Sequence, residues 1–291
     1  FKSNIMYSVH NGGILNIWEL PNKYFNLTND IKKPKAIING LSQNATVIDC
    51  HPNADNVLTI GCNDAVYTVD LTKLCIVNSI KNINSTVTSI QYNKNGELIR
   101  ALNEKGNLLS FDPRNKPNIK PLIDSIKCSG EEILHLNVTG DKVCVAGLTG
   151  FKEPILKIFD LKSNDISTET DKINYGHKQC RSLLRYDKYT NILYATFRTV
   201  ADLICFTIKD NIFAKQALYN GVKDTFYGFV MYPKNNIKSR EINKCVKLSK
   251  NRIQLINHTK GGKLIYKSLP KKIKTSVMTC DDYFIKKLNT E

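Results

Sequence analysis

The sequence has no long apolar run. No segment of its 291 residues approaches the roughly 20 consecutive apolar residues that a transmembrane helix needs. The first residues, Phe1 to Asn4, lead directly into strand-like sequence without the apolar region of a signal peptide. Hydrophobic residues make up 42% of the chain, which is enough for a real core. We therefore expect a soluble, cytoplasmic, globular protein.

The sequence also has no C-x-x-C pair. Its nine cysteines are odd in number and mostly lie within apolar segments, such as Val143–Val145 and Leu203–Phe206. This distribution is typical of reduced thiols in a protein core, because free cysteine behaves as a small hydrophobic residue. A disulfide framework is not expected.

Signatures of catalysis and cofactor binding are missing too. There is no G-x-x-x-x-G-K-[ST], G-x-S-x-G or paired-cysteine motif. The histidines are far apart and show no metal-ligand spacing; they are His10, His51, His135, His177 and His258. We interpret His51, which precedes Pro52, as a turn residue between two strands. The sequence therefore predicts neither an enzyme nor a metal or cofactor site.

Four aspartates near strand ends have the residue type of acid or base catalysts. They are Asp49, Asp70, Asp112 and Asp160. At such positions a carboxylate more often accepts hydrogen bonds from turn amides or from Ser and Thr. We expect these four residues to have structural roles.

Short alternating segments rich in Val, Ile, Tyr and Thr, separated by Asn, Gly, Asp and Pro, run through most of the chain. One strand shape recurs in five places: Ile14–Leu20, Ala65–Leu71, Leu108–Asp112, Leu156–Leu161 and Leu203–Ile208. Its key residue is Trp18 in the first copy and Val69, Phe111, Phe159 and Phe206 in the others. The copies are roughly 42 to 51 residues apart, which is close to the period of a propeller blade of four strands. The pattern predicts an all-β fold, a β-propeller of the WD-repeat kind.

Polar turns precede the first three copies, at Val9–Gly13, Ile60–Asp64 and Leu102–Asn107. We interpret them as hairpins between the second and third strands of successive blades, since Asn and Gly tolerate the backbone of tight turns. Residues 1–258 are predicted to form the blades. Residues 259–291 lose the period and are predicted to be an extension that packs on the propeller.

The chain has a formal net charge of +16. Such a charge suits a partner with a negative surface: nucleic acid, anionic lipid or an acidic protein filament. Abundant Lys and Asn can equally reflect compositional bias with no partner. Charge alone does not choose among these possibilities.

Three segments resemble one known family, the coronins. His51–Ala65 is similar to the coronin pattern His-Pro-x-Ala-x-Asn-Val-Leu followed by Gly-Cys-Asp-Asn, although the order after Cys62 is Asn-Asp and Val69 stands at the Trp position. Tyr92–Ile99 resembles the family's Trp-Asn-x-Asn-Gly-Ser-Leu-Ile, and Phe111–Arg114 stands where coronins carry Ile-Asp-Pro-Arg. The last match comprises Met231–Lys234, Ile242–Cys245, Ser268–Lys272 and Asp281–Tyr283.

The resemblance covers nearly the whole chain and implies a fold and a partner. Coronins have a seven-bladed propeller that binds filamentous actin, then a linker and a C-terminal coiled coil that oligomerises. By this comparison the chain begins inside the second blade, and the first blade and the coiled coil are missing from it. The resemblance implies a cytoskeleton-associated protein that organises or cross-links filaments, regulates actin dynamics and motility, and works as a homo-oligomer with other cytoskeletal regulators.

A basic cluster in the last blade and the extension is the candidate actin-binding site. We expect actin contacts from Lys234, Lys238, Arg240, Lys244, Lys271 and Lys272. One alternative is a general WD-repeat adaptor that holds proteins together without binding actin. The other is a propeller that binds nucleic acid, with Tyr227, Phe229 and Tyr232 available for stacking, but no nucleic-acid module is present and we do not expect this partner.

Overall fold

All secondary structure that can be described in this protein is β-structure. The computed structural model describes residues 5–20, 32–93, 95–115, 120–123, 129–136, 142–161, 167–174, 182–187, 190–197, 203–209, 212–219, 225, 227–231, 241–249 and 253–259. Within these ranges no helix has the length and hydropathy that crossing a bilayer requires. The strands pair in antiparallel sheets of three or four.

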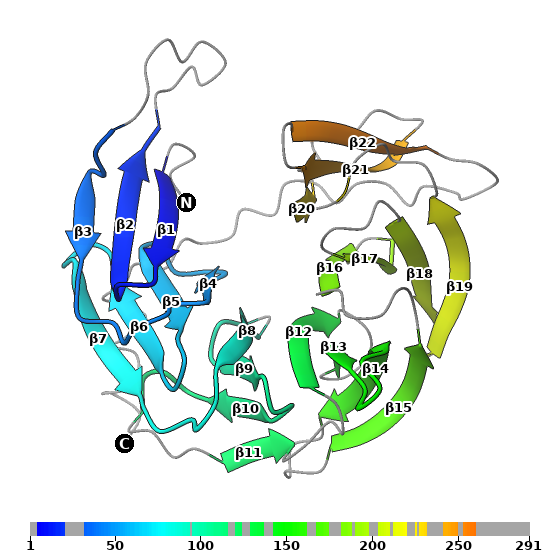
Figure 1. The fold of residues 1–291 in the computed structure, drawn as a ribbon, viewed down its shortest axis with the longest axis horizontal. Helices are drawn as coiled ribbons and strands as arrows, with labels where there is room; N and C mark the ends of the chain where they lie inside the picture. Colours follow the sequence, from blue (N-terminus) through cyan, green and yellow to red (C-terminus); the bar gives the residue numbers. More distant parts are fainter. Residues whose placement is uncertain are drawn as a thin grey trace. The chain divides into compact units, whose positions relative to one another are not determined.

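The chain divides into two compact units, and each is described by itself. The first unit contains strands β1 to β11, and the second contains β12 to β22. In both units the sheets follow one another in chain order (Figure 1).

Three sheets make up the first unit. The first sheet has three described strands, β1 (Ile5–His10), β2 (Ile14–Glu19) and β3 (Ala36–Ile38). The second sheet is formed by β4 (Val47–Cys50), β5 (Val57–Gly61), β6 (Val66–Asp70) and β7 (Cys75–Ile80). The third is formed by β8 (Val87–Tyr92), β9 (Ile99–Asn103), β10 (Leu108–Phe111) and β11 (Lys120–Ile123).

Three further sheets make up the second unit. The fourth sheet comprises β12 (Ser129–Leu136), β13 (Lys142–Leu148), β14 (Pro154–Leu161) and β15 (Ser167–Asn174). The fifth comprises β16 (Ser182–Asp187), β17 (Ile192–Phe197), β18 (Leu203–Lys209) and β19 (Ile212–Tyr219). The sixth has three described strands, β20 (Gly228–Met231), β21 (Glu241–Leu248) and β22 (Ile253–Thr259).

The middle strands of the second sheet are buried on both faces. Every residue of β5 and β6 is buried. Leu58 and Ile60 belong to the core that this sheet shares with the first sheet, whereas Val66 belongs to the core shared with the third. Burial of apolar surface stabilises a folded protein by about 25 cal/mol per Å², so the cores between stacked sheets stabilise each unit.

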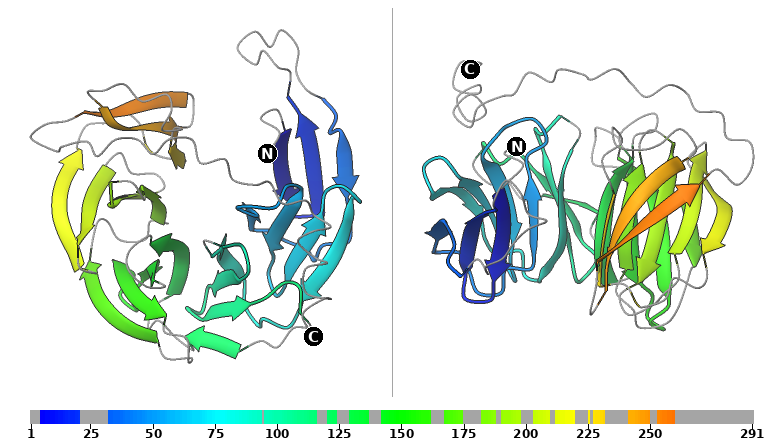
Figure 2. Two further views of the ribbon diagram at one scale, coloured as in Figure 1. Left: turned by 180° about the vertical axis from the view of Figure 1, so that it is seen from behind. Right: turned by 90° about the horizontal axis from the view of Figure 1, so that it is seen from above.

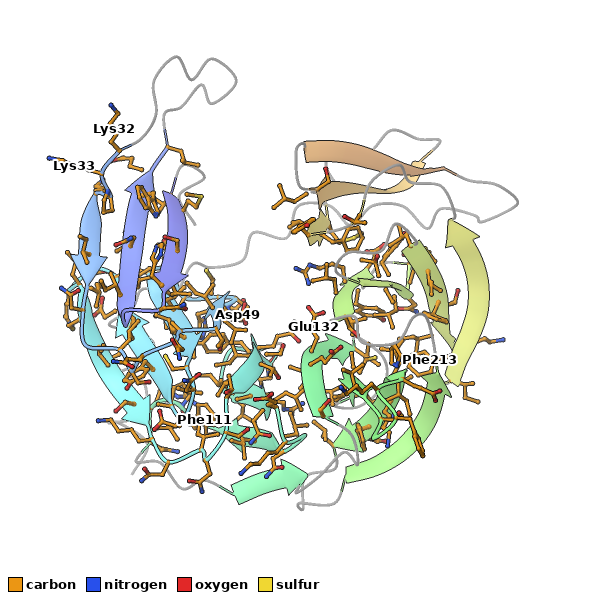
Figure 3. All side chains as sticks on the ribbon, viewed as in Figure 1. Lys32, Lys33, Asp49, Phe111, Glu132 and Phe213 are labelled. Carbon is orange, nitrogen blue, oxygen red and sulfur yellow. The ribbon has the colours of Figure 1, made fainter. Side chains whose placement is uncertain are left out.

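The second unit is built in the same way. Leu156, Leu184 and Phe206 belong to the core between the fourth and fifth sheets. Phe206 also meets Phe213 of β19 in an edge-to-face contact with ring centroids 5.9 Å apart; Phe213 is labelled in Figure 3. In the view from above, the green and yellow strands of this unit run alongside one another (Figure 2).

The recurring strand shape predicted from the sequence is confirmed. Its five copies are β2, β6, β10, β14 and β18. The last four are the third strands of their sheets, and β2 is the middle one of three described strands. The three predicted polar turns join β1 to β2, β5 to β6 and β9 to β10. A β-bulge between the third and fourth strands recurs beside Val69, Phe159 and Phe206. A bulge increases local twist, so its repetition at one blade position is independent support for a structural repeat.

One third strand was missed. β22 (Ile253–Thr259) occupies this position in the sixth sheet, and its sequence did not show the recurring shape. The predicted extension begins at residue 259, and residues 260–291 lie outside the described part of the chain. The predicted division into blades and an extension stays a prediction.

Candidate protein-binding site

Most of the predicted actin-binding residues lie outside the described residues. These are Lys234, Lys238, Arg240, Lys271 and Lys272. The backbone of Lys244 belongs to β21, where it pairs with Asn257 of β22, but its side chain is outside the description. The basic cluster therefore stays a prediction.

Exposed lysines also occur in the first unit. Lys32 and Lys33 precede β3 and point away from the sheet (Figure 3). Lys35 forms an ion pair with Glu19, with Nζ and Oε2 2.7 Å apart. Lys81 directly follows β7 and Lys105 lies in the turn between β9 and β10, and both are exposed. Exposed positive charge therefore occurs in the first unit as well as in the predicted basic cluster.

His51 joins the second sheet to the third. Its side chain is 1% exposed, and Nδ1 accepts hydrogen bonds from the backbone N–H groups of Asn53 (3.0 Å) and Ala54 (2.7 Å). The proton is therefore on Nε2, which donates to the carbonyl oxygen of Gly96 at 3.0 Å. Burial lowers the pKa of His51 to about 4. The predicted turn role is confirmed, and the bond to Gly96 adds a link between sheets.

Asp49 makes a second link between these sheets. Its Oδ2 accepts a hydrogen bond from the backbone N–H of Tyr92 on β8 at 3.0 Å, and its Oδ1 accepts one from Cys50 at 3.0 Å. The Tyr92 hydroxyl is hydrogen bonded to Thr59 of β5. Burial raises the pKa of Asp49 to about 6, and the two backbone hydrogen bonds partly offset that effect. Asp49 lies on β4, the first strand of its sheet (Figure 3).

The second unit uses the same arrangement with glutamates. A β-bulge between Gly130 and Glu132 of β12 lets two consecutive carboxylates reach β16. Glu131 accepts the backbone N–H of Ser182 at 2.9 Å, and Glu132 accepts that of Leu184 at 2.5 Å. Arg185 also donates to Glu132 at 3.0 Å. A carboxylate on the first strand thus holds the backbone of the next sheet in both units; the sequence did not reveal it because these residues are close only after folding.

The other aspartates have structural partners, as expected. Asp70 accepts the backbone N–H groups of Thr72 (2.7 Å) and Lys73 (3.0 Å). Asp112 accepts both the backbone and the guanidinium of Arg114. Asp160 differs from the prediction, because its partner is the buried ammonium of Lys142 on β13, at 2.6 Å.

No chemical site emerges from the remaining titratable groups that the structure describes. Within the described ranges no three His, Cys, Asp or Glu side chains are grouped as metal ligands would be. Cys62, Cys144 and Cys205 are buried free thiols, as predicted, whereas Cys75 is exposed. Burial raises the pKa of Cys144 well above its usual range and that of Cys50 to about 11, so both thiols stay protonated and unreactive.

The stacking residues of the nucleic-acid alternative are not all available. Phe229 is 1% exposed and lies against Tyr194, with ring centroids 6.3 Å apart. Its ring belongs to the core between the fifth and sixth sheets and cannot stack on a base. Tyr227 is exposed, and Tyr232 lies outside the described residues.

The shifted pKa values of Asp49 and His51 predict opposite pH dependences of stability. The contribution of Asp49, whose folded pKa is raised, is present below pH 4 and is lost as the pH rises through 6. The contribution of His51, whose folded pKa is lowered, is present above pH 6.5 and is lost as the pH falls through 4. Between pH 4 and 6 the two effects oppose each other.

In the variant Asp49→Asn, the pH dependence of stability that comes from His51 should therefore no longer be opposed by that of Asp49. Relative to the wild type, the variant should gain up to about 3 kcal/mol of unfolding free energy between pH 4 and pH 7, because a shift of one pKa unit is about 1.4 kcal/mol. Urea unfolding of both proteins at several pH values measures this gain. A difference between the two proteins that does not change with pH would contradict the assignment.

Taken together, short antiparallel sheets that stack in chain order within each unit, with a recurring strand and a recurring bulge, define a β-propeller of the WD40 kind. Solved structures agree with this fold. The WD40 domain of coronin from Toxoplasma gondii superposes with a TM-score of 0.79 and 18% sequence identity, covering 98% of this chain and 75% of that one. A chain of the mitotic checkpoint complex superposes with a TM-score of 0.65 and 10% identity, covering 88% of this chain and 73% of that one. No protein-family model and no curated protein matches the sequence.

Proposed function

We propose that this protein is a binding scaffold for actin filaments, which it organises or cross-links in the cytoskeleton. The observation that carries the proposal is the superposition with a coronin WD40 domain over 98% of the chain, which agrees with the family that the sequence motifs resemble. The net charge of +16 suits an acidic filament. Cross-linking requires linked copies, because linkage raises apparent affinity by orders of magnitude and lets one molecule hold two filaments.

Co-sedimentation with actin filaments tests the proposal. The variant Lys238→Glu, Arg240→Glu, Lys244→Glu should bind about ten- to a hundredfold more weakly than the wild type, since the loss of three surface ion pairs at about 0.5–1 kcal/mol each accounts for such a change. The matched control is Lys33→Glu, Lys81→Glu, Lys105→Glu, which makes the same change of net charge on exposed lysines of the first unit. The control should bind within about threefold of the wild type.

Other results of the co-sedimentation experiment would lead to different conclusions. Equal weakening by both triple variants would show that overall charge, and not the predicted cluster, drives binding. A wild-type protein that stays in the supernatant would overturn the actin proposal. Tight binding to polyanionic RNA in the same buffer would then favour the nucleic-acid alternative.

A second candidate is a WD40 adaptor for other proteins, without actin binding. It is favoured by the superposition with a chain of the mitotic checkpoint complex, a multiprotein assembly. The fold is shared by both candidates, so fold alone does not separate them. The co-sedimentation result does.

A further inference from the structure

The turn between β13 and β14 carries the most exposed large apolar side chain among the described residues. Phe151 is 84% exposed, whereas the next, Val230 and Ile212, are 57% and 56% exposed. A phenylalanine at this exposure leaves almost its whole ring in water. It contributes nothing to the cores of the second unit, which are formed by other residues.

Three hydrogen bonds hold the turn that carries Phe151. The N–H of Thr149 donates to the carbonyl of Glu153 at 2.9 Å, and the N–H of Lys152 donates to the carbonyl of Thr149 at 2.8 Å. The Thr149 hydroxyl oxygen accepts a third bond, from the N–H of Glu153, at 3.2 Å. Below the turn, β13 and β14 pair without a bulge from Leu148 and Pro154 to Lys142 and Asp160.

The tip of the turn is open. A side chain added at Gly150 would meet no atom within 4 Å, so nothing in the described structure covers the turn next to Phe151. Lys152, on the other side of Phe151, is exposed and has a left-handed backbone with φ of 59°. The turn therefore exposes an aromatic residue and a lysine at consecutive positions on a hydrogen-bonded backbone.

These properties are those of a binding hot spot. Large apolar side chains that enter a partner's pocket carry much of the energy of protein interfaces, and a rigid support loses little conformational entropy on binding. The lysine beside the ring favours a pocket with an acidic rim. An isolated exposed apolar residue is common on protein surfaces, but one at 84% exposure on a triply hydrogen-bonded turn is placed for contact.

We propose that Phe151 is an anchor that inserts into an apolar pocket with an acidic rim on the partner filament, with Lys152 beside that rim. This inference rests on the proposed function, because it takes the filament as the partner. It adds a contact in the fourth sheet, apart in sequence from the basic cluster of the last blade.

Co-sedimentation of Phe151→Ala with actin filaments tests the anchor. The variant should bind about tenfold or more weakly, as expected for loss of a buried aromatic ring, with an unchanged unfolding midpoint. Phe151→Leu should keep most of the affinity. Ile212→Ala is the control, since Ile212 is an exposed apolar residue of the same unit, and it should bind like the wild type.

Each other result counts against the inference in a different way. If the wild type fails to sediment with filaments, both the proposed function and the anchor are overturned. If the wild type binds and Phe151→Ala binds equally well, only the anchor is overturned. If Phe151→Ala loses binding to vesicles of phosphatidylserine and phosphatidylcholine but not to filaments, the ring is a membrane contact and the filament anchor is wrong.

Discussion

Phe229→Ala should be strongly destabilising, by about 3–5 kcal/mol, the usual cost of truncating a buried aromatic ring. Phe229 is 1% exposed, and its ring contacts Tyr194 and a core that includes Ile192, Leu203 and Cys205. This ring holds the sixth sheet against the fifth. The loss of stability should therefore be largest in β20, β21 and β22. Equilibrium urea unfolding measures the total change in unfolding free energy.

The neighbouring residue provides the control. Val230 lies next to Phe229 in β20 but is 57% exposed, so Val230→Ala should change stability by no more than about 0.5 kcal/mol. Hydrogen exchange resolves the location of the effect: in Phe229→Ala the amides of the sixth sheet should be accelerated more than those of β13. Uniformly faster exchange in the whole chain would contradict a local role.

Gly96→Ala should lower stability by about 2–4 kcal/mol, which corresponds to a fall of roughly 5–15 °C in the thermal midpoint. Gly96 has φ of +78°, a conformation that costs an alanine about 1 kcal/mol. An added Cβ would also lie 2.3 Å from the His51 ring, which three hydrogen bonds hold in place. Overpacking in such a site costs about a further 1–3 kcal/mol.

Two further variants separate the causes. Gly150→Ala should be nearly neutral, because a Cβ there meets no atom within 4 Å. In the double variant His51→Ala, Gly96→Ala the ring that causes the clash is gone, so the double variant should be more stable than the sum of the single effects predicts, by about 1–3 kcal/mol. Strictly additive effects would show that the contact with His51 is not the cause.

The recurring third strand was predictable because it depends on local pattern. The alternation around Trp18, Val69, Phe111, Phe159 and Phe206 shows in the sequence, since one strand face must be apolar wherever two sheets stack. β22 lacks this shape, so only its pairing with β21 identified it. Of the predicted basic site, no side chain is described, and it stays a prediction.

The links between sheets were not predictable in the same way. The bond from Asp49 to Tyr92 joins residues 43 positions apart, and that from Glu132 to Leu184 joins residues 52 apart. Nothing in the local sequence around either carboxylate indicates its partner. The nucleic-acid alternative needed Phe229 for stacking and failed for the same reason, because the burial of Phe229 depends on Tyr194 of another sheet.

The sequence by itself determined the fold class, the position of the five recurring strands and the structural role of His51, because each depends on residue spacing or on turn chemistry within a few positions. Only the tertiary structure decided which polar groups join neighbouring sheets, which aromatic rings are buried and which, like Phe151, remain in water. Those properties arise from contacts between residues that are distant in the chain, and their free energy exists only once the sheets are stacked.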